Sequence, residues 1–445
     1  MLSKKMYMET AEKLIKAIGK CTCSFTTVRY VREKLENSGY RELKLSEMPD
    51  WKVNKGEKIY INVYDSSIFA FNIGDRAGEK TNGCTLRLAA AHTDSPALYI
   101  KPKPEMINRG YGKVNVEMYG AAILSTWLDR PLSAAGKLSL RSDDVFCPRT
   151  VITDIGKSLF TIPNLAIHLN REINRGIELN RQNDMQPVCA ILEEQLNESS
   201  FFMDYLGEQL NVNREDILDY ELYIYNNEEG CIMGLNDDII SSPRLDNITS
   251  VEAIINALTA DTSGQENKYA IKGAVLFDNE EVGSRSKQGA DSLMLSVIIE
   301  RLYLSLGLTR DMYLSDIVNG FMLSADVAHG LHPNHNEKAD VTNINMLNGG
   351  VVFKRACSQT YSTDSKSVAI GEQICRRHNI PYQKFASRSD VTTGSTLGSI
   401  ADKYLPLRTV DVGVPILAMH SARETMGVKD QYYLEQFVKA FYAQQ

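Results

Sequence analysis

Two adjacent glutamates, Glu280 and Glu281, carry side chains that could bind a metal ion or act as a base in catalysis. They follow a short, β-prone apolar run at residues 274–277 and precede Gly283, where a turn is expected. Open α/β sheets bind their ligands at the carboxyl ends of strands, and adjacent strand side chains point in different directions. One carboxylate could therefore hold a metal ion while the other acts as a base, although a solvated acidic turn would give the same pattern.

His92 ends a second apolar run, which begins at residue 85. Asp94 stands two residues later, and a metal-bound imidazole commonly needs an acidic or carbonyl acceptor for its other ring nitrogen. The spacing does not decide whether Asp94 serves His92 or another group. A lone histidine after a strand can be purely structural. A functional role for His92 therefore depends on whether other polar residues also lie at strand ends.

Three more polar residues occupy comparable positions. Asp326 ends one apolar run, and His420 ends another at residues 409–420, which we expect to be the last strand. Asp246 precedes an apolar helix expected at residues 248–258, where it could also be an N-cap. Because strand ends meet at one edge of a sheet, we expect these residues to converge with His92 and the two glutamates. Two histidines and three carboxylates, with Asp246 bridging, would hold two divalent ions around a shared water. Such nitrogen and oxygen ligation suits Zn²⁺, with Co²⁺ or Mn²⁺ as alternatives.

Three of the seven histidines lie close together, at His329, His332 and His335. A spacing of three residues is compatible with a metal site, but Pro333 breaks any helix that would align all three. We therefore favour one histidine that lines a pocket over a cluster of histidine ligands.

The composition indicates a globular protein of more than one domain. Its 445 residues exceed what one compact core usually holds, and the 43% hydrophobic and 24% charged contents are ordinary. A net charge of −7 argues against nucleic-acid or anionic-membrane partners. No transmembrane run or signal-peptide core is visible and the eight cysteines are scattered, so we expect reduced thiols and a cytoplasmic location.

The pattern of elements changes between residues 99 and 235. Outside this segment we expect a β-hairpin at residues 59–72 and helices at residues 6–18, 24–38, 248–258, 289–306 and 430–442. Within it, short alternating strands are separated by turn residues, with a polar helix expected at residues 193–210. We therefore predict a discontinuous α/β catalytic domain, residues 1–98 and 236–445, with an inserted β-rich domain, residues 99–235.

One histidine of this insert, His168, lies in the apolar segment 164–170. We interpret the segment as a strand, in which a buried core histidine is the simplest interpretation.

Seven sequence segments point to a known family. They are HTDSP from His92, TWLDRPLSAAG from Thr126, NLAIHLNR from Asn164, LDN from Leu245, DNEEVGS from Asp278, SADVAHGLHPN from Ser324 and AMHSARETMG from Ala418. In composition and order they resemble the aspartyl aminopeptidases of the M18 metallopeptidase family, nearly from end to end. The resemblance implies an α/β, mixed-sheet zinc-aminopeptidase catalytic domain with an inserted β-rich dimerisation domain.

The resemblance also implies roles for individual residues. It makes Glu280 the general base, we place Asp94 with it among the catalytic residues, and the implied metal ligands are His92, Asp246 (bridging), Glu281, Asp326 and His420. His329, Lys354 and Tyr361 fall at substrate-contact positions. By the same resemblance the chain forms dimers that assemble into a tetrahedral dodecamer, in which His168 reaches a neighbouring subunit's active site.

The chain departs from the commoner family pattern at residues 21–26 and 388–395. Neither segment supplies a metal ligand, so the expected reaction is unaffected. The second is expected near the substrate pocket, which leaves the preferred substrate side chain open.

The expected reaction is removal of the N-terminal residue from a peptide with a free N-terminus. A water shared by two cations loses a proton readily, and Glu280 would take that proton and give it to the leaving amine. Metal and His168 would stabilise the oxyanion, and Asp326 could bind the substrate's α-amino group. Lys354 could pair with an acidic first side chain, which favours Asp or Glu, unless it is a surface lysine.

Three alternatives remain from the sequence. One is an aminopeptidase of the same family that prefers neutral or hydrophobic N-terminal residues. The second is a related dinuclear amidohydrolase, which would not be expected to carry the segments from Asn164 and Ser324. The third is a non-catalytic assembly protein with the same fold, against which the intact Glu280 and the complete ligand set argue.

Overall fold

The computed structural model describes residues 4–81, 83–191, 200–260, 268–391 and 394–444. Contacts between residues divide the chain into two compact units. The first comprises Met1–Asp94, Gly230–Met419 and Glu424–Gln445, and the second comprises Ser95–Glu229 and His420–Arg423. Within the described ranges, no helix is both long enough and apolar enough to cross a membrane.

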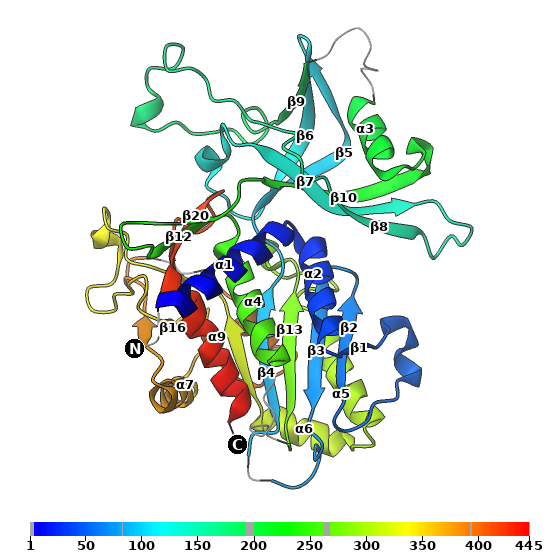
Figure 1. The fold of residues 1–445 in the computed structure, drawn as a ribbon, viewed down its shortest axis with the longest axis vertical. Helices are drawn as coiled ribbons and strands as arrows, with labels where there is room; N and C mark the ends of the chain where they lie inside the picture. Colours follow the sequence, from blue (N-terminus) through cyan, green and yellow to red (C-terminus); the bar gives the residue numbers. More distant parts are fainter. Residues whose placement is uncertain (1–3, 82, 192–199, 261–267, 392–393, 445) are drawn as a thin grey trace. The chain divides into compact units, whose positions relative to one another are not determined.

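A nine-stranded mixed sheet forms the centre of the first unit (Figure 1). Its spatial order is β1 (Arg41–Glu42), β2 (Lys58–Val63), β3 (Ser67–Ile73), β13 (Ile271–Phe277), β4 (Leu86–His92), β14 (Phe321–Ala325), β18 (Arg408–Gly413), β16 (Val351–Lys354) and β17 (Tyr382–Phe385). Strands β13, β4, β14 and β18 run parallel to their neighbours in this series, with Phe277 beside His92. Their carboxyl ends therefore lie at one edge of the sheet, as expected from the sequence.

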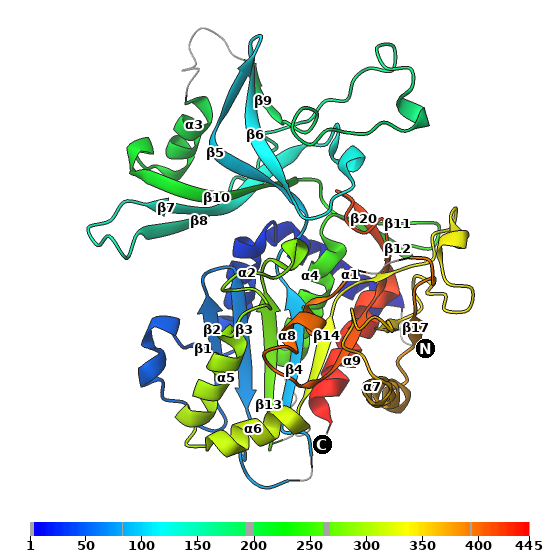
Figure 2. The same ribbon diagram turned by 180° about the vertical axis from the view of Figure 1, so that it is seen from behind.

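Helices cover both faces of this sheet. One face carries α1 (Lys4–Lys20), α2 (Ser24–Asn37), α4 (Leu245–Thr259) and α9 (Val428–Ala443) (Figure 1). The other carries α5 (Met294–Ser305), α6 (Arg310–Asn319) and the short α8 (Leu397–Ala401) (Figure 2). Helix α7 (Ser365–His378) contacts α9 and β18. The mixed α/β fold is thus confirmed, with α5 starting five residues later than the sequence suggested.

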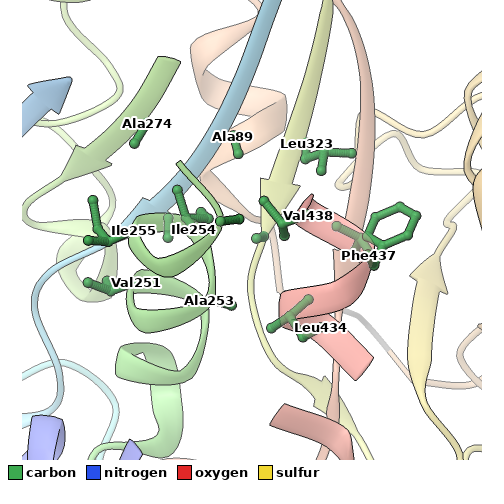
Figure 3. Packing of buried hydrophobic residues seen from close by; sticks show 14 of the residues in the cluster. Ala89, Val251, Ala253, Ile254, Ile255, Ala274, Leu323, Leu434, Phe437 and Val438 are labelled. Carbon is green, nitrogen blue, oxygen red and sulfur yellow. The ribbon is translucent and has the colours of Figure 1, made fainter. Parts of the chain in front are cut away.

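The core of the first unit shows why these segments become buried strands and helices. Ile254 of α4 and Phe437 of α9 pack together with Ala89 and Leu323 of the central strands, and all four side chains are fully buried (Figure 3). Small alanines on the strands let the helices lie close, and the larger helix side chains fill the space. Burying each such large side chain contributes roughly 1.5–3 kcal/mol. This packing fixes the strand ends that carry the polar residues.

A second, five-stranded sheet of the first unit has the order β11 (Cys231–Met233), β12 (Ile239–Ser242), β20 (Glu424–Gly427), β19 (Pro415–Leu417) and β15 (Ala328–His329). The prediction of a single strand at residues 409–420 is wrong, because the chain leaves the nine-stranded sheet after β18 and joins the five-stranded sheet as β19. Pro415 lacks a backbone N–H and starts the new strand, a position that suits proline. Two 3₁₀ helices of this unit are η1 (Leu45–Asp50) and η6 (Asn336–Lys338), and a third, η5 (Glu280–Val282), belongs to the site.

The second unit is a six-stranded antiparallel sheet with the order β8 (Arg149–Asp154), β7 (Leu132–Leu140), β10 (Ile217–Asn226), β5 (Ala97–Asn108), β6 (Tyr111–Tyr119) and β9 (Val188–Ile191). Helix α3 (Phe201–Leu210) packs on it through Phe202, whose ring lies 5.9 Å from that of Phe160. The helix expected at 193–210 is present from Phe201 onward, and residues 193–199 lie outside the described residues. The unit also contains η2 (Leu124–Trp127), η3 (Ile173–Arg175) and η4 (Arg214–Asp216).

Candidate metal centre

His92 occupies the last position of β4 and is 1% exposed. Its Nδ1 donates to the main-chain carbonyl of Asp94 at 3.0 Å, and the Asp94 carboxylate lies 3.3 Å from the same nitrogen. This bond fixes the ring orientation and places the lone pair of the neutral imidazole on Nε2. Nε2 is therefore the nitrogen that can bind a metal ion.

Two carboxylates face that nitrogen. Asp246 Oδ1 lies 3.2 Å and Asp326 Oδ1 lies 3.7 Å from His92 Nε2. Ligand atoms of the three residues all lie within 4.8 Å of one another, and Asp246 is 3% exposed. One imidazole nitrogen and two carboxylate oxygens at this spacing form a donor set that fits Zn²⁺. The residues present thus fit the kind of metal that the sequence predicted.

Glu280 and Glu281 begin η5, which starts three residues after the end of β13. Asp94 Oδ1 accepts from the Glu280 N–H at 3.2 Å, and Asp94 Oδ2 accepts from the Glu281 N–H at 3.1 Å. Asp94 therefore serves both alternatives left open by the sequence, because it contacts His92 and also holds the two glutamates in place. A carboxylate oxygen of Glu281 lies within 4.8 Å of one of Asp246, so Glu281 extends the donor group beyond His92.

Glu280 sits in an unusual electrostatic environment. The pKa of its carboxyl is raised to about 8, chiefly by burial; His92 acts in the opposite direction, and the neighbouring carboxylates of Asp326, Asp94 and Asp246 contribute to the rise. A carboxylate with a raised pKa is a better proton acceptor than an ordinary surface glutamate. The role of Glu280 as general base remains a prediction.

His420 belongs to the second unit. There its Nδ1 donates to the main-chain carbonyl of Ala121 at 3.0 Å, which places the lone pair on Nε2 as in His92. The ring is thus prepared for coordination through Nε2, and its role as a ligand remains a prediction.

One buried acidic residue escaped the sequence analysis. Glu424 of β20 is 2% exposed, and its Oε2 accepts from the Asp246 N–H at 3.0 Å. It therefore holds the backbone at a predicted metal ligand. Its position four residues after His420, in the segment shared with the family, was the only available signal, because the pairing of β20 with β12 cannot be read from local spacing.

Lys354 is not a surface lysine, since its side chain is 2% exposed. Its Nζ lies 3.3 Å from Asp326 Oδ2 and 3.1 Å from the main-chain oxygen of Val327. The ring of Tyr361, which is 6% exposed, lies with its centroid 5.3 Å from the same Nζ. Lys354 and Tyr361 thus stand directly behind a predicted ligand.

His329 is exposed and lines a cavity of about 340 Å³. The ring of Phe385 lies between it and Tyr361, with centroid distances of 6.0 Å and 6.4 Å respectively. His332 and His335 line the same cavity, and among the described residues neither belongs to a group of three potential ligands. All three histidines thus line this cavity, whereas the sequence analysis favoured one, and the predicted role of His329 in substrate binding remains a prediction.

His168 lies in the second unit, in a turn rather than in a strand, and is exposed. The interpretation of residues 164–170 as a strand with a buried core histidine was therefore wrong. Leu165, Ile167 and Leu169 around it are more than 50% exposed, so this apolar segment does not pack into the unit's own core.

The fold and the donor group together define a metal-dependent α/β enzyme. A family model described as "Aminopeptidase I zinc metalloprotease (M18)" matches residues 17–442. The chain therefore belongs to the M18 family of zinc metalloaminopeptidases, which are hydrolases, and the resemblance drawn from its sequence motifs is confirmed.

Individual relatives agree with this assignment. Over 439 residues the chain is 40% identical to "Probable M18 family aminopeptidase 2" of Clostridium novyi, covering 98% of this chain and 99% of the relative. The protein of the same name from Clostridium acetobutylicum is 41% identical over 440 residues, with 98% and 99% covered. Among solved structures, one titled "Cryo-EM structure of the Ape4 and Nbr1 complex" matches with a TM-score of 0.91 at 30% identity, covering 100% of this chain and 87% of the other. An M18 aminopeptidase from Thermotoga maritima shares the fold with a TM-score of 0.85 at 20% identity, covering 99% and 97%.

Proposed function

We propose that this aminopeptidase uses two divalent metal ions and Glu280 as general base to release N-terminal residues from peptides. The observation that carries the proposal is the buried approach of Asp246 and Asp326 to His92 Nε2, with Glu280 and Glu281 held beside them by Asp94. The ions are proposed to be Zn²⁺, with Co²⁺ or Mn²⁺ as alternatives.

The proposed ligands form two sets that share Asp246. The first consists of His92, Asp246 and Asp326, and the second of Asp246, Glu281 and His420. When bound, the metal ions would polarise the peptide carbonyl and make the attacking water more acidic. In this proposal Asp94 is a positioning residue, because it orients His92 and the backbone of both glutamates.

Glu280 would accept the proton of the attacking water and transfer it to the leaving amine. The raised pKa of its carboxyl is consistent with a proton acceptor, and positive charge beside it would favour the ionised form that starts the reaction. Asp326 would attract the free α-amino group of the substrate, which limits cleavage to the N-terminal residue. His168 of a neighbouring copy is proposed to help stabilise the developing oxyanion.

The substrate preference has two candidates. A preference for Asp or Glu would use the positive charge of Lys354, supported by the family resemblance. A preference for neutral side chains is favoured by one observation, since Lys354 Nζ already lies 3.3 Å from Asp326 Oδ2 and part of its charge is balanced there. We propose the acidic preference and treat the neutral one as its direct competitor.

The second unit is proposed to act as a dimerisation domain, corresponding to the inserted domain at residues 99–235, in dimers that form a tetrahedral dodecamer. A fold neighbour at 22% identity is titled "Structure of S. cerevesiae mApe1 dodecamer". The exposed apolar segment around His168 would suit a subunit contact. A cytoplasmic location is also proposed, supported by the eight cysteines, which form no disulfide bond with one another in the part of the chain that the structure describes.

The test is release of free amino acid from peptides that begin with Asp, Glu, Leu or Lys, with and without a chelator. We expect chelator-sensitive release, fastest from the Asp and Glu peptides, and no release from N-acetylated versions of the same peptides. Faster release from the Leu peptide would favour the neutral preference. Release that survives exhaustive metal removal would refute the metal-dependent mechanism.

A further inference from the structure

A second buried carboxylate lies on the same face of the central sheet as Lys354. The register of β16 and β18 pairs Phe353 with Val412, and the next step along both strands sets Lys354 opposite Asp411. On its other side, β18 pairs with β14, where Asp411 lies beside Ser324. Since side chains alternate along strands, Lys354 and Asp411 share the face opposite the one that packs on α4 and α9.

Asp411 is tightly held. It is 0% exposed, its Oδ2 accepts from the Ser362 N–H at 2.6 Å, and its Oδ1 accepts from the hydroxyl of Thr396. Helix α8 comes close to this position because Gly398 has no side chain, and a Cβ there would lie 3.1 Å from Asp411 Oδ1. A fully buried carboxylate with these two donors is held in one orientation. Burial raises the pKa of this carboxyl, while the Lys354 ammonium and the hydrogen bonds that it accepts act in the opposite direction, so its negative charge depends on those partners.

Without Asp411, the Lys354 ammonium and the Asp326 carboxylate would neutralise each other and leave no net charge for a cation. Lys354 is buried, and a buried ammonium requires a carboxylate partner. Asp326 supplies one through Oδ2, but its Oδ1 faces His92. If Asp326 were the only partner, a metal ion and Lys354 would compete for the same negative charge. With Asp411 as a second carboxylate near Lys354, the three side chains Lys354, Asp326 and Asp411 carry one net negative charge. That charge is then available to a cation.

We propose that Asp411 is a positioning residue that holds the Lys354 ammonium against Asp326 Oδ2 and so directs Asp326 Oδ1 toward the metal-binding group. The inference rests on the proposed role of Asp326 as a ligand and extends it. It gives Lys354 a task that is independent of the substrate's side chain. Residues that orient metal ligands in this way typically change metal affinity or activity by 10–100-fold when they are mutated.

The experiment is a double-mutant cycle between Asp411→Asn and Lys354→Met. For each protein, zinc affinity is measured by competition with a chromogenic chelator and kcat/KM is measured on one peptide. In the wild-type background, we expect Asp411→Asn to lower zinc affinity by about tenfold and kcat/KM by about tenfold. In the Lys354→Met background, we expect Asp411→Asn to lower neither quantity further. Unchanged zinc affinity and turnover in Asp411→Asn would overturn the proposal. Equal losses in both backgrounds would also overturn it, because Asp411 would then act without Lys354.

Asp430→Asn is the matched control. Asp430 is also 0% exposed and accepts from two backbone N–H groups, those of Asn348 and Gly350, but it lies at the start of α9. We expect it to keep wild-type zinc affinity and kcat/KM. A zinc loss in this control equal to that of Asp411→Asn would overturn the proposal, because any buried carboxylate would then give the effect.

Two further variants complete the design. If Asp411→Asn does not fold, Thr396→Val removes a donor to Asp411 and is expected to cause a smaller loss in the same direction, confined to the background that retains Lys354. Wild-type behaviour of Thr396→Val would then overturn the proposal. His92→Ala is measured in parallel, because intact zinc binding in that variant refutes the proposed metal centre itself, whereas lost binding there with an unaffected Asp411→Asn refutes only the role of Asp411.

Discussion

His92 and Asp94 are joined by a 3.0 Å hydrogen bond from the imidazole Nδ1 to the main-chain carbonyl, while the Asp94 carboxylate accepts from the two successive N–H groups of Glu280 and Glu281. One residue thus connects the end of β4 to the turn after β13. His92 is a proposed metal ligand and Glu280 is the proposed general base. A substitution at Asp94 should therefore affect both metal binding and proton transfer.

We predict that Asp94→Asn lowers kcat/KM by about 10–100-fold and weakens zinc binding in the same range. The amide of asparagine retains one acceptor oxygen, but its NH₂ group would face a backbone N–H that now lacks an acceptor. Steady-state kinetics and a zinc titration measure the two effects. Asp94→Ala should be at least as impaired, and wild-type kinetics in the alanine variant would show that Asp94 does not position these residues.

The second prediction concerns Glu280→Gln. The substitution keeps the size of the side chain and removes its ability to accept a proton, so kcat should fall by about 10²–10⁴-fold. Glutamine does not remove any proposed ligand, so the zinc content measured by elemental analysis and the subunit assembly measured by light scattering should stay the same. Turnover within a few-fold of wild type would exclude Glu280 as the general base.

The sequence could predict those parts of the site that depend on strand ends. His92, Asp326 and Glu280 each follow an apolar run, and parallel strands bring such residues to one edge whatever their separation along the chain. Glu424 and Asp411 could not be found in this way, because their relation to the site depends on which strands pair and in what register. Local spacing contains no information about strand order.

The sequence also misled at specific places. An apolar run suggested a strand around His168, but the apolar residues there are exposed in a turn, so their hydrophobicity does not report burial within the unit. The run from residue 409 to His420 looked like one strand, yet it is divided between two sheets. In both cases the sequence pattern identified apolar side chains correctly. The backbone conformation of these segments depends on tertiary contacts, which the pattern does not contain.

The third prediction is that metal removal lowers stability as well as activity. Asp246 and Asp326 both lie within 4 Å of one imidazole nitrogen, and without cations these buried carboxylates repel one another. A ligand that binds only the folded state at 100 times its Kd stabilises that state by about 2.7 kcal/mol. Calorimetry should therefore show a lower Tm in chelator and a Tm that rises with zinc concentration. His92→Ala should lose that zinc dependence, and an equal rise in this variant would place the stabilising zinc elsewhere.

The fourth prediction concerns pH and a residue remote from the proposed chemistry. Asp430 is fully buried at the start of α9, and this burial raises the pKa of its carboxyl from 3.8 to about 7, against the effect of the backbone N–H groups that bond to it. The folded protein therefore keeps a proton that the unfolded chain loses near pH 4. The resulting stabilisation is fully present below about pH 4 and is lost as the pH rises through about 7, so this group makes the free energy of unfolding fall across that window.

Urea unfolding at half-unit steps from pH 5 to pH 8 tests this sign. The difference in unfolding free energy between Asp430→Asn and wild type should shift in favour of the variant as the pH rises, since asparagine cannot ionise. Asp340→Asn is the control, because hydrogen bonds from the Asn343 side chain and nearby backbone lower the pKa of that carboxyl to about 2, so its titration is complete below this range. A wild-type minus Asp430→Asn difference that stays constant over pH 5–8 would contradict the prediction. It would mean that Asp430 is already ionised throughout this range and that its backbone donors offset the cost of burying its charge.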